Sequence, residues 1–147
     1  MAASGPGELT EIEGHLTSHQ YVEILDSVML PSARAMLLPH PEPVYIAMDN
    51  APMHNSQAVK QWFNDHPDVI RIPWPAKSPD LMPIENLWAA MTKKWNGNVP
   101  RNRDNLVAHA RQVWEELRGD DLCSKLVGSM GNRLWNVVEK GGFSTKY

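Results

Sequence analysis

The 147-residue sequence has little cysteine, no long apolar run and a small net charge of −3. Its single cysteine, Cys123, excludes an intramolecular disulfide, and no cluster of Cys and His has the spacing of a zinc site. No apolar run approaches the roughly 20 residues that cross a bilayer. The N-terminus lacks the basic start and apolar core of a secretory signal. No glycine-rich loop has the P-loop or dinucleotide-binding pattern.

What the chain does contain is a globular composition, with 42% hydrophobic residues, 21% charged residues and six Trp. Its length suits one domain of ordinary size. The charge is uneven: residues 1–92 carry 4 Lys+Arg and 11 Asp+Glu, whereas residues 93–147 carry 10 and 6. A basic C-terminal third is able to meet a polyanion such as nucleic acid, although a solvated helical surface is the simpler interpretation.

The first third of the chain predicts one strand and one helix. Alternating polar and apolar residues over Glu8–Glu13 are typical of a half-buried or edge strand. Thr17 and Gln20 have the spacing of a capping box at the start of a helix. Pro31 is expected to end or kink that helix, with Ser32 as the cap of a new one.

A strand–helix–strand unit follows. Val44–Met48 is short and largely apolar, which predicts a strand buried on both faces. Asn55 or Ser56 is able to cap the next helix, and Val69–Ile72 predicts a second strand. Because the connections are tight and a helix intervenes, the two strands should be parallel.

The remaining residues predict an irregular proline loop and then helices. Three prolines exclude regular structure over residues 73–80, and Pro83 suits the first position of a helix. Asp104 is a candidate cap for a helix that ends at Gly119. A last helical region is expected over residues 121–140, with an interruption at residues 128–131.

Two acids stand out by their positions. Asp49 follows the predicted strand at the edge where open α/β sheets place ligand sites, and Glu85 lies in the first turn of the helix after Pro83. Carboxylates that converge at such an edge hold hard cations such as Mg²⁺, and paired ions promote phosphoryl transfer. Each acid also has a simpler explanation, because Asp49 suits the cap of the following turn and Glu85 is an ordinary first-turn acid.

The motifs around these acids resemble the catalytic domain of mariner-type (Tc/mariner superfamily) DDE transposases. The two acids are separated by 35 residues, which suits the mid-thirties interval of that family. The flanking segments 7–34 and 95–117 are similar to the neighbouring parts of the same domain, so the resemblance covers nearly the whole chain. The matching motifs are MDNAPMHNS (48–56), WFNDHP (62–67) and IPWPAKSPDLMPIENLWAAMTKKW (72–95).

The resemblance implies an RNase H-like fold that cleaves and transfers DNA strands with Mg²⁺ or Mn²⁺. Asp49 would be the second catalytic acid and metal ligand, and Glu85 the third. DNA would be the partner and the nucleus the place of action, although no targeting signal is evident. No membrane association is implied.

The first acid and the first two strands of that fold would precede this chain, as would the helix-turn-helix region of the family. We therefore expect an α/β chain with a truncated RNase H-like fold, the first two strands missing, followed by C-terminal helices. Residues 1–147 would form a single partial domain, with residues 7–95 as the RNase H-like part and residues 96–147 as the helical part. The Glu8–Glu13 strand is expected to pair directly with Val44–Met48; self-association through an exposed sheet edge and poor solubility are the alternatives.

Two neighbours of the acids complete the candidate site. His54 belongs to the same motif as Asp49, but a structural histidine packed over the turn explains it equally well. Met82 stands where the family usually has Asn, and methionine has no side-chain oxygen to cap the helix that carries Glu85. Two hypotheses stay open: a metal-dependent nuclease that uses Asp49 and Glu85, and a non-catalytic nucleic-acid-binding or protein-interaction module. Because the first acid is absent, catalysis is expected to be impaired, and whether the chain is an enzyme stays open.

Overall fold

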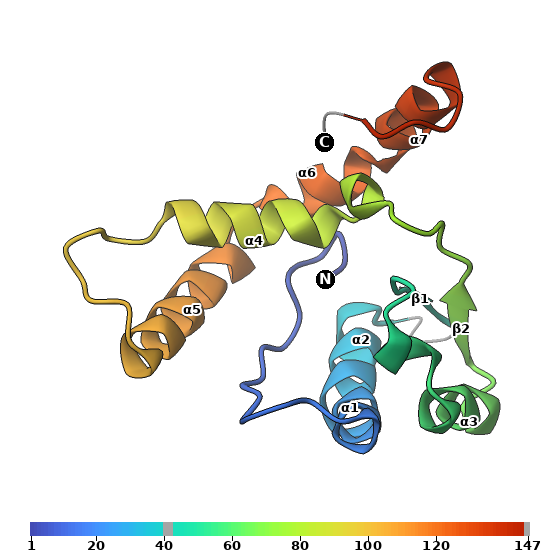
Figure 1. Cartoon of the computed structure of the whole chain (residues 1–147), viewed down its shortest axis with the longest axis horizontal. Coiled ribbons are helices and arrows are strands. Elements are labelled where there is room, and N and C mark those ends of the chain that lie inside the picture. Colours follow the sequence, from blue (N-terminus) through green and yellow to red (C-terminus); the bar gives the residue numbers. More distant parts are fainter. Residues whose placement is uncertain (40–42, 146–147) are drawn as a thin grey trace. The chain divides into compact units, whose positions relative to one another are not determined.

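The computed structural model describes residues 1–39 and 43–145 (Figure 1). It contains helices and strands in two compact units, each with its own core. We call Thr10–Lys77 the strand unit, and Met1–Leu9 together with Ser78–Tyr147 the helical unit. This division concerns packing, so the predicted boundary between residues 95 and 96 stays a prediction. None of the described helices is both long and apolar enough to cross a membrane.

The strand unit is built around a parallel pair of strands. Its helices are α1 (Ser18–Ile24), α2 (Leu30–Met36) and α3 (Gln57–Asp65), and its strands are β1 (Val44–Ala47) and β2 (Val69–Ile72). The register pairs Val44 with Val69 and Ala47 with Ile72. Figure 1 shows α3 on the path between the two strands. The predicted strand–helix–strand unit with parallel strands is therefore confirmed.

The core of the strand unit lies on one face of the two strands. Its buried side chains come from the first helical region, both strands and α3: Leu25, Leu30, Val44, Val59, Trp62 and Val69. The opposite strand face is open, with Tyr45 62% exposed and Ile70 39% exposed. The prediction that Val44–Met48 is buried on both faces was wrong, because the helices of this unit pack on one face only.

The predicted strand over Glu8–Glu13 is absent from the described residues, and β1 pairs only with β2 there. The segment up to Leu9 packs instead in the helical unit, where the Trp114 indole N–H donates to the Gly7 carbonyl at 2.9 Å. From Thr10 to Glu13 the side chains are exposed, Ile12 among them. The alternation of polar and apolar residues therefore gave a wrong strand prediction, because a strand also needs a neighbouring strand for its backbone N–H and C=O groups.

The first helix confirms one expectation and corrects another. Thr17 and Gln20 form the predicted capping box. Pro31 does not end the helix: a π-helical turn over Leu25–Met29 leads directly into α2, and the Leu30 N–H donates to the Leu25 carbonyl. Proline lacks an N–H and crowds the carbonyl four residues earlier, and the wider turn accommodates both features. Ser32 lies inside α2 rather than at its N-cap, and its hydroxyl donates to the Met36 sulfur at 3.8 Å.

In the described residues of the helical unit, a 3₁₀ turn at Pro79–Leu81 is followed by four helices. They are α4 (Pro83–Lys93), α5 (Arg103–Arg118), α6 (Leu122–Gly128) and α7 (Met130–Glu139). Figure 1 shows α5, in orange, joined to α4 by a long loop. The core side chains are Leu87, Met91, Val113, Trp114, Leu117 and Cys123.

Local signals placed most ends of these helices. Pro83 is the first residue of α4, Gly119 caps the end of α5, and the break between α6 and α7 falls where glycines predicted it. The cap of α5 is Asn102 rather than the predicted Asp104, because the Asn102 side chain accepts the Asn105 N–H at 2.9 Å. Asp104 lies in the first turn, where a carboxylate favours the positive end of the helix dipole.

Replacing Met82 by asparagine is expected to stabilise the helical unit by about 1 kcal/mol. Met82 occupies the N-cap of α4 with extended backbone (φ −85°, ψ 107°), and its side chain makes no capping hydrogen bond. An asparagine oxygen at this position is able to accept a first-turn N–H of the helix. Urea unfolding of Met82→Asn and Met82→Ala measures the gain, and equal stability of the two variants would contradict it.

Candidate active site

The turn after β1 places Asp49 at the carboxyl end of a parallel strand. Asp49 is the second residue beyond β1, and its Oδ1 accepts the Ala51 backbone N–H at 3.1 Å. A 3₁₀ turn over Pro52–Asn55 follows, and Ser56 then caps α3 by accepting the Val59 N–H. The simpler expectation, that Asp49 caps its own turn, is therefore confirmed. Its side chain is nevertheless 59% exposed, which leaves the carboxylate accessible to a ligand.

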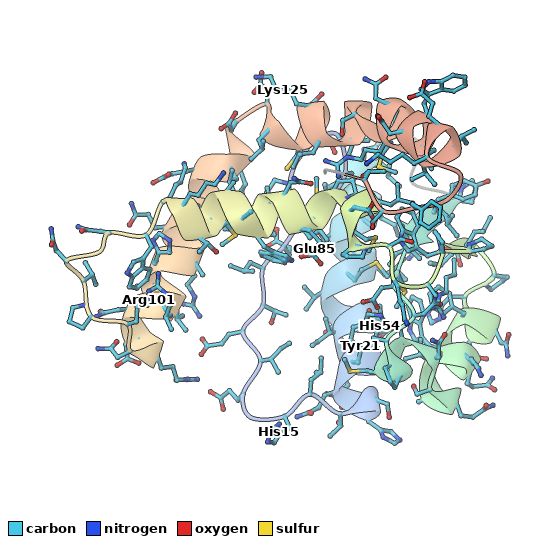
Figure 2. All side chains as sticks on the ribbon, turned by 45° about the horizontal axis from the view of Figure 1, so that its top comes forward. His15, Tyr21, His54, Glu85, Arg101 and Lys125 are labelled. Atoms are coloured by element: carbon cyan, nitrogen blue, oxygen red, sulfur yellow. The ribbon has the colours of Figure 1, made fainter. Side chains whose placement is uncertain are left out.

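His54 packs over this turn and contacts the acid directly. Its Nδ1 lies 2.6 Å from the Asp49 Oδ1, and its side chain is only 19% exposed. The His54 and Tyr21 rings have centroids 4.8 Å apart, and Figure 2 shows the two side chains next to each other. The expectation of a structural histidine over the turn is confirmed, with the addition that this histidine orients one carboxylate oxygen.

Arg71 of β2 holds the same turn from the neighbouring strand. Its guanidinium donates to the Asp49 carbonyl at 3.1 Å, to the His54 carbonyl at 3.0 Å and to the Asn55 Oδ1 at 3.0 Å. The sequence reasoning missed this residue. The available signal was a charge within the otherwise apolar strand Val69–Ile72, on the face that Val69 turns toward the core.

Tyr21 connects α1 to this site electrostatically. Burial and, secondly, the charge of Asp49 raise the pKa of the Tyr21 phenol from 10.0 to about 12, while the charge of Arg71 opposes the shift. The phenol therefore stays neutral beside the carboxylate over the whole physiological pH range. No signal in the sequence indicates this role, because Tyr21 simply shares the helical spacing of apolar residues with Ile24, Leu25 and Val28.

Stability is expected to fall between pH 10 and about 12 because of Tyr21. In that window the folded chain keeps the phenol proton while the unfolded chain loses it, so the contribution is complete below pH 10 and disappears as the pH rises. Because Tyr21 is partly exposed, we expect a loss of about 1–2 kcal/mol. Urea unfolding of wild type and Tyr21→Phe over this range isolates it, since the phenylalanine variant should lack this part of the decline. Parallel pH profiles would contradict the assignment.

Glu85 lies in the first turn of α4, where the helix dipole favours a negative charge. Its side chain is exposed, and Figure 2 labels it beside α4. Its backbone N–H donates to the Met82 carbonyl at 3.1 Å, which closes the first turn without help from a side chain. Asp49 belongs to the strand unit and Glu85 to the helical unit, so their convergence on one cation stays a prediction.

The two carboxylates fit a hard divalent cation by their chemistry. Both are exposed oxygen donors of the kind that Mg²⁺ and Mn²⁺ bind, and the only hydrogen bonds of the Asp49 carboxylate within the described part of the chain are on Oδ1. Across residues 1–39 and 43–145, no group of three or more His, Cys, Asp or Glu side chains is arranged to hold a metal ion. Asp49 and Glu85 each have the donor chemistry for such a cation, and that they form one site stays a prediction.

Comparison with known proteins gives a consistent result. Residues 1–107 match the family described as DDE superfamily endonuclease. The Tcb1 transposase of Caenorhabditis briggsae is 32% identical over 141 residues, which are 96% of this chain and 50% of that protein. The Tc1 transposase of Caenorhabditis elegans is 31% identical over 147 residues, 100% of this chain and 52% of that protein. The chain thus spans about half the length of these curated relatives.

Solved structures show the fold. The crystal structure of the catalytic domain of Mos1 mariner transposase has a TM-score of 0.79 at 20% identity and covers 95% of this chain and 69% of that one. A second structure of that catalytic domain, described as containing Mn, has a TM-score of 0.78. The mixed helix and strand arrangement is therefore that of the Mos1 catalytic domain, although only two strands pair within the described residues.

Proposed function

Because this chain belongs to the DDE superfamily endonucleases and is homologous to Tc1 and mariner transposases, we propose that it acts on DNA. Asp49 and Glu85 serve as the ligands of Mg²⁺ or Mn²⁺ in this proposal. The ancestral reaction is metal-dependent cleavage and transfer of DNA strands. The observation that carries the proposal is the exposed Asp49 carboxylate at the carboxyl end of a parallel strand, held in place on one oxygen.

The residues of the turn prepare Asp49 to bind a cation. Ala51 and His54 orient the Oδ1 oxygen and leave Oδ2 without a hydrogen bond among the described residues, while Arg71 fixes the backbone carbonyl of the same residue. Asp49 and Glu85 would hold such cations, and a pair of them would supply activation of the attacking oxygen and stabilisation of the leaving oxygen at a phosphodiester. Glu85 would supply the second carboxylate from the first turn of α4, where the helix dipole favours a negative charge.

A second candidate is a nucleic-acid-binding or protein-interaction module without catalysis. It is favoured by the excess of basic residues in the C-terminal third, where residues 93–147 carry 10 Lys+Arg and 6 Asp+Glu. The basic residues after Lys93 would contact DNA, although ion pairs already hold Lys94 to Glu116 and Lys125 to Asp121, each at 2.7 Å. The nucleus is the proposed compartment for either candidate.

The open sheet edge is a proposed site of self-association. Within the described residues β1 and β2 pair only with each other, so each has an edge without a strand partner there. Such edges pair readily with strands from another chain. Sedimentation of the full chain over a range of concentrations would measure this association.

Mn²⁺ calorimetry and a plasmid-nicking assay on the full chain test the proposal. Asp49→Asn and Glu85→Gln are each expected to lower Mn²⁺ affinity at least tenfold and to abolish any nicking. Asp104→Asn is the matched control, because Asp104 is also an exposed first-turn acid of the helical unit. Unchanged Mn²⁺ affinity in both acid variants would overturn the metal assignment. Salt-sensitive DNA binding without nicking would instead support the second candidate.

A further inference from the structure

We infer that Arg133 is a positioning residue that fixes the helix start carrying Glu85. This inference rests on the proposed function only in the role that it gives Glu85. Arg133 lies on α7 and is 2% exposed, the largest of the fully buried side chains. It is also the only charged residue among the buried residues that the structure describes. A buried guanidinium is costly unless hydrogen bonds satisfy its donors, so its contacts identify what it holds in place.

The guanidinium binds on both sides of the α4 helix start. Its Nη1 donates to the Asp80 carbonyl at 2.8 Å, and its Nη2 donates to the Asn86 Oδ1 at 2.8 Å. Asp80 belongs to the 3₁₀ turn before the helix, and Asn86 is the residue after Glu85. One rigid planar group therefore ties the incoming loop to the first turn of α4.

Arg133 is itself fixed by its own helix region. Its Nε donates to the Ser129 Oγ at 2.8 Å, and the Ser129 hydroxyl donates to the Leu126 carbonyl at 2.6 Å. A second tie comes from the end of the described chain, where the Thr145 N–H donates to the Asp80 Oδ2 at 2.6 Å. Two residues of the C-terminal region, Arg133 and Thr145, thus form hydrogen bonds to the segment that contains Glu85.

This arrangement matters because the helix start has no cap of its own. Met82 offers no side-chain acceptor to the first turn, so Pro83 begins α4 without a capping hydrogen bond to hold that start in place. The guanidinium supplies hydrogen bonds to this region from a distant helix. The Glu85 side chain is exposed, and the Arg133 guanidinium donates to Asp80 and Asn86 on either side of it in the sequence. Arg133 therefore acts through the backbone that carries Glu85.

Amide hydrogen exchange of the full chain tests the inference independently of any activity. Arg133→Lys keeps the charge but is unable to bridge both acceptors, and Asn86→Ala removes one acceptor with less risk to folding. In each variant we expect exchange over residues 81–87 to accelerate at least tenfold, while α5 keeps its protection. Arg118→Lys is the matched control, since Arg118 pairs with Glu115 at the surface of the same unit.

Two further measurements separate positioning from general stability. Adding Met82→Asn to Arg133→Lys supplies a local cap and should recover most of the lost protection in residues 81–87. Mn²⁺ affinity should fall severalfold in Arg133→Lys and stay at the wild-type level in Arg118→Lys. Exchange over residues 81–87 that is unchanged, or that accelerates equally in α5, would overturn the inference. If Glu85→Gln binds Mn²⁺ as wild type does, the proposed metal role fails, whereas the exchange result still decides the positioning role.

Discussion

Replacing Trp62 by alanine is expected to lower the free energy of unfolding of the strand unit by about 3–5 kcal/mol. Trp62 is 5% exposed and packs in the core beside both strands. Its ring stacks on His66 with centroids 4.2 Å apart and meets Phe63 edge-on at 5.2 Å. Its indole N–H donates to the Asp26 Oδ1 at 3.4 Å. The substitution removes all of these contacts and leaves a cavity that the short strands are unable to close.

The size of this loss also tests whether the two cores are independent. A loss of this magnitude is a large fraction of the roughly 5–15 kcal/mol that stabilises an ordinary domain. Amide exchange during urea unfolding should therefore show β1, β2 and α3 losing protection well before α5 and α6. Trp135→Ala is the control, because Trp135 is 63% exposed and its removal should change stability by at most about 0.5 kcal/mol. Equal loss of protection in both units would show one cooperative core and contradict two separate ones.

Features that depend on a few neighbouring residues could be predicted from the sequence. The capping box of Thr17 and Gln20, the Ser56 cap and the start of α4 at Pro83 all occur where the spacing placed them. Each depends on partners within about one helical turn, so the residues carry the whole signal. The parallel strand pair was also predictable, because short connections leave few topologies open.

Features decided by distant partners could not be predicted. The alternation over Glu8–Glu13 is compatible with a strand, but Leu9 packs into the helical unit and no neighbouring strand is available within the described residues. Pro31 is a helix breaker by its chemistry, yet the π-helical turn before it relieves the missing N–H. In the first case tertiary packing overruled a correct local preference, and in the second a π-helical turn of the same helical segment accommodated the proline.

In the candidate site, too, features that depend on neighbouring residues were predictable and features that depend on remote residues were not. Sequence position marked Asp49 and its turn as candidates, and the proximity of His54 is a local feature of the same motif. The metal role of Asp49 came from the family resemblance and stays a prediction. Arg71 and Arg133 were missed because their acceptors are remote in sequence. The Asp49 carbonyl is 22 residues before Arg71, and the Asp80 carbonyl is 53 residues before Arg133. A charged residue within an apolar strand or on a buried helix face therefore indicates that hydrogen-bond acceptors from a remote part of the chain lie beside it.

Replacing Arg71 by methionine is expected to loosen the Asp49 turn and to lower the stability of the strand unit by about 1.5–3 kcal/mol. Methionine keeps much of the apolar stem but removes the donors that hold Asp49, His54 and Asn55. Two of the three acceptors are partly buried, and they lose a charged partner that water replaces incompletely. Arg71→Lys should recover little of the loss, because one ammonium group is unable to reach all three oxygens.

Amide exchange over residues 49–56, together with urea unfolding, measures both parts of this prediction. Arg34→Met is the matched control in the same unit, because Arg34 forms an ion pair with Asp68 at 2.7 Å and its side chain is 40% exposed. A surface pair of this kind contributes at most about 1 kcal/mol. If Arg71→Met costs no more than Arg34→Met and leaves exchange in the turn unchanged, then Arg71 does not organise the turn. If the turn loosens while Asp49 is intact, a parallel fall in Mn²⁺ affinity would show that the cation requires a preformed turn as well as a carboxylate.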